Sequence, residues 1–478
     1  MRIILLPSAA LVATLLAGAA ATAADMPVRS FVKASPLAAY NWGGFYAGVN
    51  GGYGVSSDPI TETFTPASDG GLQPTIAPAG WLGGLQAGYN WQWNRLVLGV
   101  EGDIQATSLR DSICYDGCRP NATAKTTQSL PWFATTRARL GYAPGAMLFY
   151  LTGGAAFTTV KTSISTTLAP TTTSGDFNDS RVGWTVGGGV EAALAANWTA
   201  KVEYLYMGFG STTHAIVEPL LGPAFPEIFS IPTRASVVRA GVNYHFNAPG
   251  SMAYASAMNA FASASPAYDW TGFYIGGNLG AAAGRNPTTL QGSGGVFDES
   301  TFSPRSLAGG LQVGFNVQRA NWVLGVEGDI QFTNLNESDC FEFCLANQTI
   351  KVEQKMPWFA TARGRVGYAL GPTLFYGTGG VAFTKVNSSY LDYDHFTFAS
   401  GNFSDNRTGW AAGGGIESAL AGNWTAKAEY LYLDFGTLRH DDIPNIAWGG
   451  TEGFTAQLHE HVFRFGVNYR FGSFPTPN

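Results

Sequence analysis

The second half of this chain repeats the first half, offset by about 226 residues. The octapeptide LGVEGDIQ at 98–105 returns unchanged at 324–331. Other shared stretches are PWFAT at 131–135 and 357–361, GGG at 187–189 and 413–415, NWTAK at 197–201 and 423–427, and GVNY at 241–244 and 466–469. A solenoid repeat has a period of roughly 20–50 residues. Because this period is far longer, each copy is expected to be a domain in its own right, produced by tandem duplication.

Each copy contains eight segments in which polar and apolar residues alternate, the pattern of β-strands with two different faces. In the first copy these segments are predicted to begin near residues 43, 80, 95, 131, 146, 181, 198 and 235. Long connections are predicted at 56–78, across a cysteine pair, at 163–180 and at 211–232, and short ones at 94, 143–145 and 195–197. Long loops at one end and tight turns at the other are typical of membrane-spanning β-barrels.

The composition agrees with a membrane barrel and excludes other classes. Charged residues make up 13% of the chain, about half their share in an average globular protein, whereas glycine (61 residues) and aromatic residues (13%) are abundant. No apolar run of about 18 residues follows the N-terminal segment, so no transmembrane helix is expected. The net charge of −6 argues against a nucleic-acid partner.

The N-terminus has the pattern of a secretory signal peptide. Arg2 supplies a positive charge, residues 3–20 are mostly apolar, and Ala21-Thr22-Ala23 has the small-residue pattern of a cleavage site. We therefore predict a signal peptide at 1–23, followed by a periplasmic segment at 24–40. An exported chain meets an oxidising compartment, so the two cysteine pairs are predicted to be loop disulfides rather than metal ligands. The pairs are Cys114 with Cys118 and Cys340 with Cys344.

The alternation within the strands predicts which side chains point into the barrel. Successive side chains of a strand point to opposite faces, and a carboxylate on the lipid face at mid-depth is destabilising. In LGVEGDIQ the two acids therefore point inward. The same reasoning puts four acids and four bases in each lumen: Glu101, Asp103, Glu191, Glu203, Arg137, Arg139, Lys201 and Arg239 in the first copy, and Glu327, Asp329, Glu417, Glu429, Arg363, Arg365, Lys427 and Arg464 in the second.

Each set of lumen charges is electrically neutral. Removing charge from water costs several kcal/mol per ion unless the charge is paired and hydrogen-bonded, so each set is expected to form a salt-bridged plug. An eight-stranded barrel has an interior just wide enough for its own side chains, and inward glycines such as Gly99 and Gly189 make room for them. We interpret Glu101 and Asp103 as structural residues rather than a catalytic pair.

Three motifs resemble the porin-like outer-membrane β-barrel domain family of bacterial surface antigens. The opening pattern WxGFYxGxNxG occurs at 42–52 and 270–280, EGD at 101–103 and 327–329, and the closing GVNYxF at 241–246 and 466–471. The resemblance covers both copies. It implies an eight-stranded barrel in the bacterial outer membrane, inserted by the barrel-assembly machinery through an aromatic-ended last strand, here Tyr469 and Phe471. Most members carry one domain and end at the last strand, whereas this chain carries two and continues to Asn478.

The two copies could form two barrels of eight strands or one barrel of sixteen. Two barrels are favoured because each copy has its own opening and closing strand, each lumen is charge-balanced, and the Ala/Ser-rich segment 248–267 is far longer than a turn. We predict barrels at 41–247 and 268–472, followed by a short tail at 473–478. A single sixteen-stranded barrel would hold an aqueous channel and act as a porin for small hydrophilic solutes. It remains the alternative.

No catalytic or phosphate-binding motif occurs in a fitting context, so we expect no enzyme, no cofactor and no metal. His459 and His461 lie on one strand face and could hold a metal or haem iron, but Arg234 and Ser236 replace them in the first copy. We predict an integral structural and surface protein of the bacterial outer membrane, with plugged lumens and displayed extracellular loops. Its expected partners are outer-membrane lipid, lipopolysaccharide and, during insertion, the barrel-assembly machinery. A haem- or host-binding surface protein is the second alternative.

Overall fold

The structure is a computed structural model that describes residues 40–64, 73–119, 121–194, 197–217, 226–246, 268–292, 295–345, 348–393, 398–445 and 450–471. The predicted signal peptide, linker and C-terminal tail lie outside the described residues, as does the predicted periplasmic segment apart from Tyr40.

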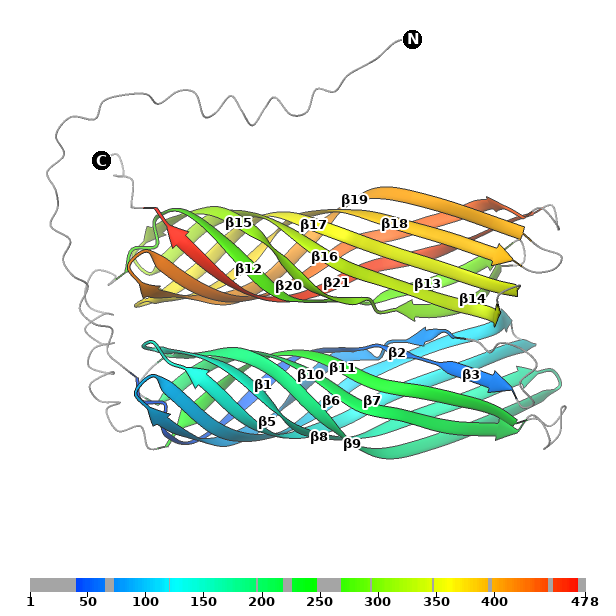
Figure 1. Ribbon diagram of the computed structural model, residues 1–478, viewed down its shortest axis with the longest axis horizontal. Helices are drawn as coiled ribbons and strands as arrows, with labels where there is room; N and C mark the ends of the chain where they lie inside the picture. Colours follow the sequence, from blue (N-terminus) through cyan, green and yellow to red (C-terminus); the bar gives the residue numbers. More distant parts are fainter. Residues whose placement is uncertain are drawn as a thin grey trace, which may run out of the picture. The chain divides into compact units, whose positions relative to one another are not determined.

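The first copy forms one closed antiparallel sheet (Figure 1). Its eight long strands are β1 (Gly44–Ser56), β5 (Ala79–Trp93), β6 (Leu96–Arg119), β7 (Ala122–Tyr142), β8 (Met147–Leu168), β9 (Thr171–Ala193), β10 (Trp198–Val217) and β11 (Pro226–His245). Three short strands lie between β1 and β5: β2 (Asp58–Pro59), β3 (Thr61–Phe64) and β4 (Thr75–Ile76). Each long strand pairs with the next one along the chain, and β1 also pairs with β11, from Tyr46 opposite His245 to Ser56 opposite Ala235. This last pairing closes the ring.

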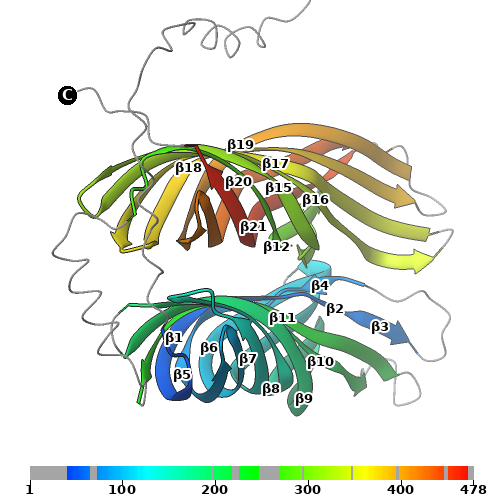
Figure 2. The ribbon, with the colours of Figure 1, turned by 60° about the vertical axis from the view of Figure 1, so that its left-hand side comes forward.

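The second copy closes in the same way, as the curved strands of each ring in Figure 2 illustrate. Its long strands are β12 (Gly272–Gly284), β15 (Arg305–Arg319), β16 (Trp322–Leu345), β17 (Gln348–Leu370), β18 (Thr373–Tyr393), β19 (Phe398–Ala421), β20 (Trp424–Pro444) and β21 (Thr451–Arg470). The hairpin of β13 (Asn286–Gly292) and β14 (Gly295–Phe302) joins the sheet through β21. The closing pair is β12 with β21, from Tyr274 opposite Arg470 to Gly284 opposite Glu460.

The all-β fold with two tandem eight-stranded barrels is therefore confirmed, and the alternative of one sixteen-stranded barrel is wrong. In a single barrel, β11 would pair with β12 and β21 with β1. Instead, each last strand pairs with the first strand of its own copy. A strand edge without hydrogen-bond partners cannot face lipid. In each copy the last strand finds its partner in the opening strand of the same copy.

The strands run much further than the sequence predicted. β7 begins at Ala122 rather than near Pro131, and β9 at Thr171 rather than near Arg181. The loops predicted at 163–180 and across the first cysteine pair are therefore mostly strand, and those predictions are wrong. The physical reason is that polar and apolar residues keep alternating, as in Ser163-Ile164-Ser165, so the chain can go on forming a two-faced sheet.

The inward side chains change in character along each barrel. Toward the end opposite the short turns, here called the outer end, they are apolar and buried. In the first barrel this outer core consists of Ile60, Ile76, Ile113, Tyr115, Ala124, Ile164, Ile216, Phe229 and Ile231. A larger apolar cluster, which includes Leu335, Val352, Val386, Tyr390 and Phe454, fills the outer half of the second barrel. Because a buried large apolar side chain contributes about 1.5–3 kcal/mol, the outer halves are packed structures and not loose loops.

An apolar band with aromatic borders surrounds the rest of the first barrel. The exposed outward residues of the band include Val49, Leu85, Leu98, Val100, Ile104, Leu140, Leu151 and Val186. The aromatic row at the short turns consists of the exposed Trp91, Trp93, Tyr142, Trp198, Tyr244 and Phe246, and a second row at the outer edge contains Trp81, Trp132 and Trp184. On β7 the two rows are marked by Tyr142 and Trp132, a spacing that matches the roughly 10 residues a tilted strand needs to cross a membrane.

In the part of the chain that the structure describes, no helix has the length and apolar character required to cross a bilayer.

The outer core should be sensitive to single changes at inward positions. Ile164 is fully buried, so Ile164→Ala should cost about 2–5 kcal/mol and should speed hydrogen exchange of the backbone amides in the outer half of β8. The outward-facing Ser163→Ala is the matched control and should leave exchange unchanged. Equal exchange in both variants would contradict a packed outer core.

Candidate functional site

The candidate site is the charged cluster inside each barrel, called the lumen network. In the first barrel β6 contributes Glu101 and Asp103, β7 Arg137 and Arg139, β9 Glu191, β10 Lys201 and Glu203, and β11 Arg239, and all eight are buried. The strand register places opposite charges side by side: Glu101 faces Arg137, Glu191 faces Lys201 and Glu203 faces Arg239. Directly opposite residues on one face of a sheet are close neighbours. The register thus supplies part of the network, and the remaining contacts join strands that face each other across the lumen, such as β7 with β10 and β6 with β11.

Two arginines and two carboxylates form a closed ring of ion pairs across the first lumen. Arg137 lies 2.9 Å from a carboxylate oxygen of Asp103 and 2.9 Å from one of Glu203. From the other side, Arg239 lies 3.0 Å from Asp103 and 2.6 Å from Glu203. Guanidinium groups suit this role because their planar donors can serve two carboxylates at once.

The remaining charges continue the network toward the short turns. Lys201 Nζ lies 2.8 Å from Glu101, which also pairs with Arg137. Arg139 lies 2.8 Å from Glu191. Every charge of the set thus has an oppositely charged neighbour within the lumen.

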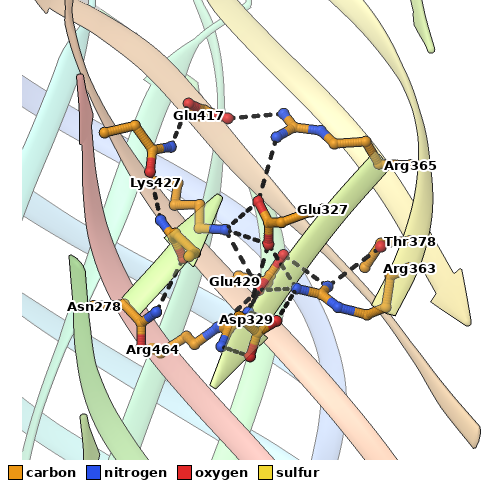
Figure 3. A network of polar contacts seen from close by, with 12 residues as sticks. Asn278, Glu327, Asp329, Arg363, Arg365, Thr378, Glu417, Lys427, Glu429 and Arg464 are labelled. Atoms are coloured by element: carbon orange, nitrogen blue, oxygen red, sulfur yellow. Dashed lines mark hydrogen bonds and ion pairs between the residues drawn. The ribbon is translucent and has the colours of Figure 1, made fainter. Parts of the chain in front are cut away.

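The second barrel builds the same network from its own residues (Figure 3). Its members are Glu327, Asp329, Arg363, Arg365, Glu417, Lys427, Glu429 and Arg464, all buried. Arg363 lies 2.8 Å from Asp329 and 3.2 Å from Glu429, and Arg464 lies 2.9 Å from Asp329 and 2.5 Å from Glu429. The ring of two arginines and two carboxylates therefore occurs twice in the chain.

Sequence reasoning missed two tyrosines that belong to the first network. The hydroxyl groups of Tyr46 and Tyr150 donate hydrogen bonds to network carboxylates at 2.7 and 3.0 Å. The guanidinium carbon of Arg139 also lies 4.2 Å from the ring centre of Tyr150, a cation–π contact. The opening motif contained a signal for Tyr46. Phe45 and Tyr46 are adjacent in a strand, so their side chains point to opposite faces, and Phe45 is the exposed one.

Two inward glycines leave the space that the network fills. A Cβ on Gly99 would come within 2.3 Å of Asn90 Oδ1 and 2.9 Å of Arg139 Cγ. A Cβ on Gly189 would come within 2.6 Å of the Tyr150 hydroxyl oxygen. Any larger residue at either position would displace a member of the network or a residue that touches it.

In both barrels the sheet is split above the outer aromatic row. Hydrogen-bonded pairing of β9 with β10 ends at Trp184 opposite Gly208, and pairing of β19 with β20 ends at Trp410 opposite Asp434. In the first barrel side chains bridge the split: His214 lies 3.1 Å from Asp179 and stacks on Phe177 at 3.9 Å between ring centres.

The second barrel bridges its split with the same residue types. His440 lies 3.0 Å from Asp405 and stacks on Phe403 at 3.8 Å. The outer halves are thus closed by side chains where the backbone ladder stops.

The outer half of the second barrel also holds two acids whose pKa values are raised by burial. Burial raises the pKa of Glu337 from 4.5 to about 8, with a further contribution from the nearby Asp339. Burial likewise raises the pKa of Asp339 from 3.8 to about 6. Ile113 takes the place of Asp339 in the first copy, where it belongs to the outer core. This pair is a feature of the second barrel only.

The cysteine and histidine predictions have different outcomes. Cys114 and Cys118 form the predicted disulfide, and Cys340 is disulfide-bonded, although the side chain of Cys344 lies outside the described residues. Nδ1 of His459 and of His461 lie 2.9 and 2.7 Å from tyrosine hydroxyl groups. Among the described residues, no group of three or more His, Cys, Asp or Glu side chains could hold a metal ion.

Comparison with known proteins identifies the family. The family described as Outer membrane protein beta-barrel domain matches the chain twice, at residues 9–246 and 252–471. The chain belongs to this family. The outer-membrane barrel domain is thus present in tandem, and each match contains one of the closed rings.

Two relatives of this outer-membrane barrel protein match it over about the length of one copy. A 31 kDa outer-membrane immunogenic protein of Brucella melitensis is 35% identical over 235 residues, which is 47% of this chain and 93% of the relative. A 22 kDa outer membrane protein of Rhizobium leguminosarum is 32% identical over 210 residues, covering 44% of this chain and 82% of the relative. This chain is accordingly a bacterial outer-membrane protein, homologous to outer-membrane immunogenic proteins, and none of these names denotes an enzyme.

Among solved structures, the outer membrane protein OprG of Pseudomonas aeruginosa is 14% identical, with a TM-score of 0.30, covering 42% of this chain and 98% of that chain. A FadL homologue of Pseudomonas aeruginosa is 10% identical, with a TM-score of 0.27, covering 90% of this chain and 91% of that chain.

Removal of one base from a lumen network should be strongly destabilising. Arg137→Ala leaves buried carboxylates without their partner and should cost about 3–5 kcal/mol in the free energy of unfolding. Arg363→Ala should cost about the same, because its contacts are equivalent. The exposed Lys125→Ala is the control and should change stability by less than about 0.5 kcal/mol. Urea unfolding of the refolded protein in lipid measures all three, and a cost below about 1 kcal/mol for both arginine variants would refute the network's role.

Stability of the second barrel should fall as the pH rises through the range set by Glu337 and Asp339. Below their ordinary pKa values both acids are protonated in the folded and unfolded states. As the pH rises above about 4, the unfolded chain releases these protons, while the folded chain retains the proton of Asp339 up to about pH 6 and that of Glu337 up to about pH 8, so unfolding becomes easier. Urea unfolding at pH 5 and pH 9 measures the difference. Glu337→Gln should reduce it, whereas an unchanged pH dependence would exclude Glu337 as its source.

Proposed function

We propose that this protein is a structural and surface component of the outer membrane, with both barrel lumens closed to solutes by their lumen networks. The observation that carries the proposal is that each lumen holds four acids and four bases, all buried and each beside an opposite charge. An interior of eight strands is about wide enough for its own side chains, and here those side chains meet across the axis.

Opening such a lumen would require the ion pairs to separate. The four groups of the ring come from four different strands: Asp103 from β6, Arg137 from β7, Glu203 from β10 and Arg239 from β11. Separation of one pair leaves the others holding the same side chains. Because unpaired buried charge costs several kcal/mol, thermal fluctuations should rarely separate these side chains enough for a hydrated solute to pass.

In this proposal the outer halves of the barrels project from the outer membrane to the outside of the cell. The membrane-crossing part ends near Trp132, whereas β7 continues to Ala122 and β8 reaches Leu168. Their outward residues are polar, as with Thr127 and Ser163, and their inward residues form the outer core. We infer that the protein displays a stiff, strand-built projection at each barrel, with the connecting loops at its tip.

The domain limits and partners in this proposal are those expected from the sequence: a signal peptide at 1–23, a periplasmic segment at 24–40, barrels at 41–247 and 268–472 joined by 248–267, and a tail at 473–478. Insertion by the barrel-assembly machinery would use the end of β21, where Tyr469 and Phe471 are exposed on the outside and lie 5.5 Å apart between ring centres. Outer-membrane lipid and lipopolysaccharide would surround both barrels.

Conductance of the refolded mature protein in a planar bilayer tests the closed lumens. The wild type should be silent or show rare small flickers, because the interior of an eight-stranded barrel is about wide enough for its own side chains and leaves little room for hydrated ions. Large, stable steps would contradict the proposal and indicate a porin.

A pair of variants makes this conductance test specific. Arg137→Ser with Arg239→Ser removes both arginines of the first ring and should produce measurable ion current where the variant still refolds. The equivalent pair in the second barrel, Arg363→Ser with Arg464→Ser, should do the same. Arg95→Ser with Arg319→Ser, which alters exposed residues at short turns, should remain silent.

A further inference from the structure

Three cations stand on the outside of the first barrel beyond its outer aromatic row, two at one level and the third, Lys125, four residues further out along β7. They are Arg110 on β6, Lys125 on β7 and Lys161 on β8, and all three are exposed. The register puts Arg110 and Lys161 on either side of one residue, because both lie opposite Ser129 of β7. Neighbouring strands are about 4.8 Å apart, so the two flanking cations start roughly 10 Å from each other with a hydroxyl group between them.

The depth of this row follows from the aromatic border. Trp132 is exposed on β7 and marks the outer edge of the apolar band. Ser129 lies three residues further out on the same strand, which is roughly 10 Å along a strand. This places the row at the level where the head groups of the outer leaflet begin.

The cations of this row lack acidic partners. No ion pair joins Arg110, Lys125 or Lys161 to a carboxylate among the described residues, whereas every cation of the lumen networks has one. The surrounding outward residues are mainly hydroxyl-bearing, for example Ser112 and Thr127, whose oxygens lie 2.9 Å apart. Asp176 on β9 is an acid exposed on the same side, and no ion pair joins it to these cations. Among the described residues, Arg110, Lys125 and Lys161 are therefore not neutralised by an ion pair.

The second copy keeps a positive charge in this row with different residues. There Lys355 occupies the central position, opposite Asn336 and Asn387, and Lys351 corresponds to Lys125. The order cation–hydroxyl–cation has become amide–cation–amide, so charge and hydrogen-bond donors are retained while the side chains are exchanged. Lys355 is partly neutralised by Glu353 at 2.6 Å. The first barrel therefore offers the stronger anion site.

We propose that Arg110, Ser129 and Lys161, with Lys125 four residues further out on β7, bind phosphate groups of lipopolysaccharide in the outer leaflet. Arginine can donate two parallel hydrogen bonds to a phosphate, lysine adds a mobile positive charge, and the serine hydroxyl can donate between them. The aromatic row below would contact the acyl chains of the same molecule. The proposal rests on the location of the protein in the outer membrane and does not depend on whether the lumens are closed.

Titration of the refolded full mature chain in zwitterionic nanodiscs with purified lipopolysaccharide tests the site. A cation near an anionic lipid surface contributes roughly fivefold in affinity, so Arg110→Ser with Lys161→Ser should weaken binding about 25-fold. The control Arg95→Ser with Arg319→Ser removes the same charge at the short-turn end and should bind like the wild type. Heat-dependent gel mobility verifies that each variant has refolded.

Two further titrations identify which chemical group of the ligand is bound. Enzymatically dephosphorylated lipopolysaccharide should bind the wild type as weakly as intact lipopolysaccharide binds the Arg110→Ser, Lys161→Ser variant. Unchanged binding by that variant, or equal binding of the dephosphorylated lipid, would overturn the proposal. So would equally tight binding of phosphatidylglycerol, since that would show a preference for any anionic lipid. Conductance plays no part in these readouts, so their failure would leave the proposed closed lumens untouched.

Discussion

The structure depends on the pairing of the first strand of each copy with its own last strand. Lipid offers no hydrogen bonds to an open strand edge, so a membrane-spanning sheet must close. Pairing of β1 with β11 closes it after eight strands, and that number sets a lumen about as wide as two layers of side chains. The narrow lumen in turn brings Arg137, Asp103, Arg239 and Glu203 within ion-pair distance. A barrel closed after sixteen strands would have held the same residues too far apart.

The same alternation of polar and apolar residues serves opposite purposes at the two ends of each barrel. Where lipid lies outside, apolar residues such as Leu140 point outward and charged residues point inward. Where water lies outside, the polarity is reversed: Ile164 points inward and Ser163 outward. Register shifts between Ala106 and Leu109 in β6 and between Ser129 and Phe133 in β7 lie at this level. One set of long strands thereby continues from a membrane barrel into a projection with an apolar core.

Much of this could be predicted from the sequence, because the lipid imposes strict rules on the crossing segments. The duplication, the eight strands of each copy, the closure into two barrels and the inward side of residues such as Glu101 all follow from repeat, alternation and charge. The outer halves could not be predicted in this way. A polar stretch such as 163–180 is easily taken for a loop when Ile164 and Phe177 are not recognised as parts of a core. The bulge near Pro131 also shifts which residues point inward, so extrapolation from the crossing segment fails beyond it. Tyr46 and Tyr150 were missed because a charge count does not register hydroxyl groups.

Closure of each copy on itself is tested most directly by cross-linking across the closing pair. Val49 of β1 lies opposite Val242 of β11, and both face outward. Oxidation of Val49→Cys with Val242→Cys in the membrane should give a disulfide that alters gel mobility until it is reduced. Val49→Cys with Val467→Cys, which would be opposite each other only if β1 paired with β21, should give none. Cross-linking of the second pair and not the first would contradict two closed barrels and, with them, the packed lumens described above.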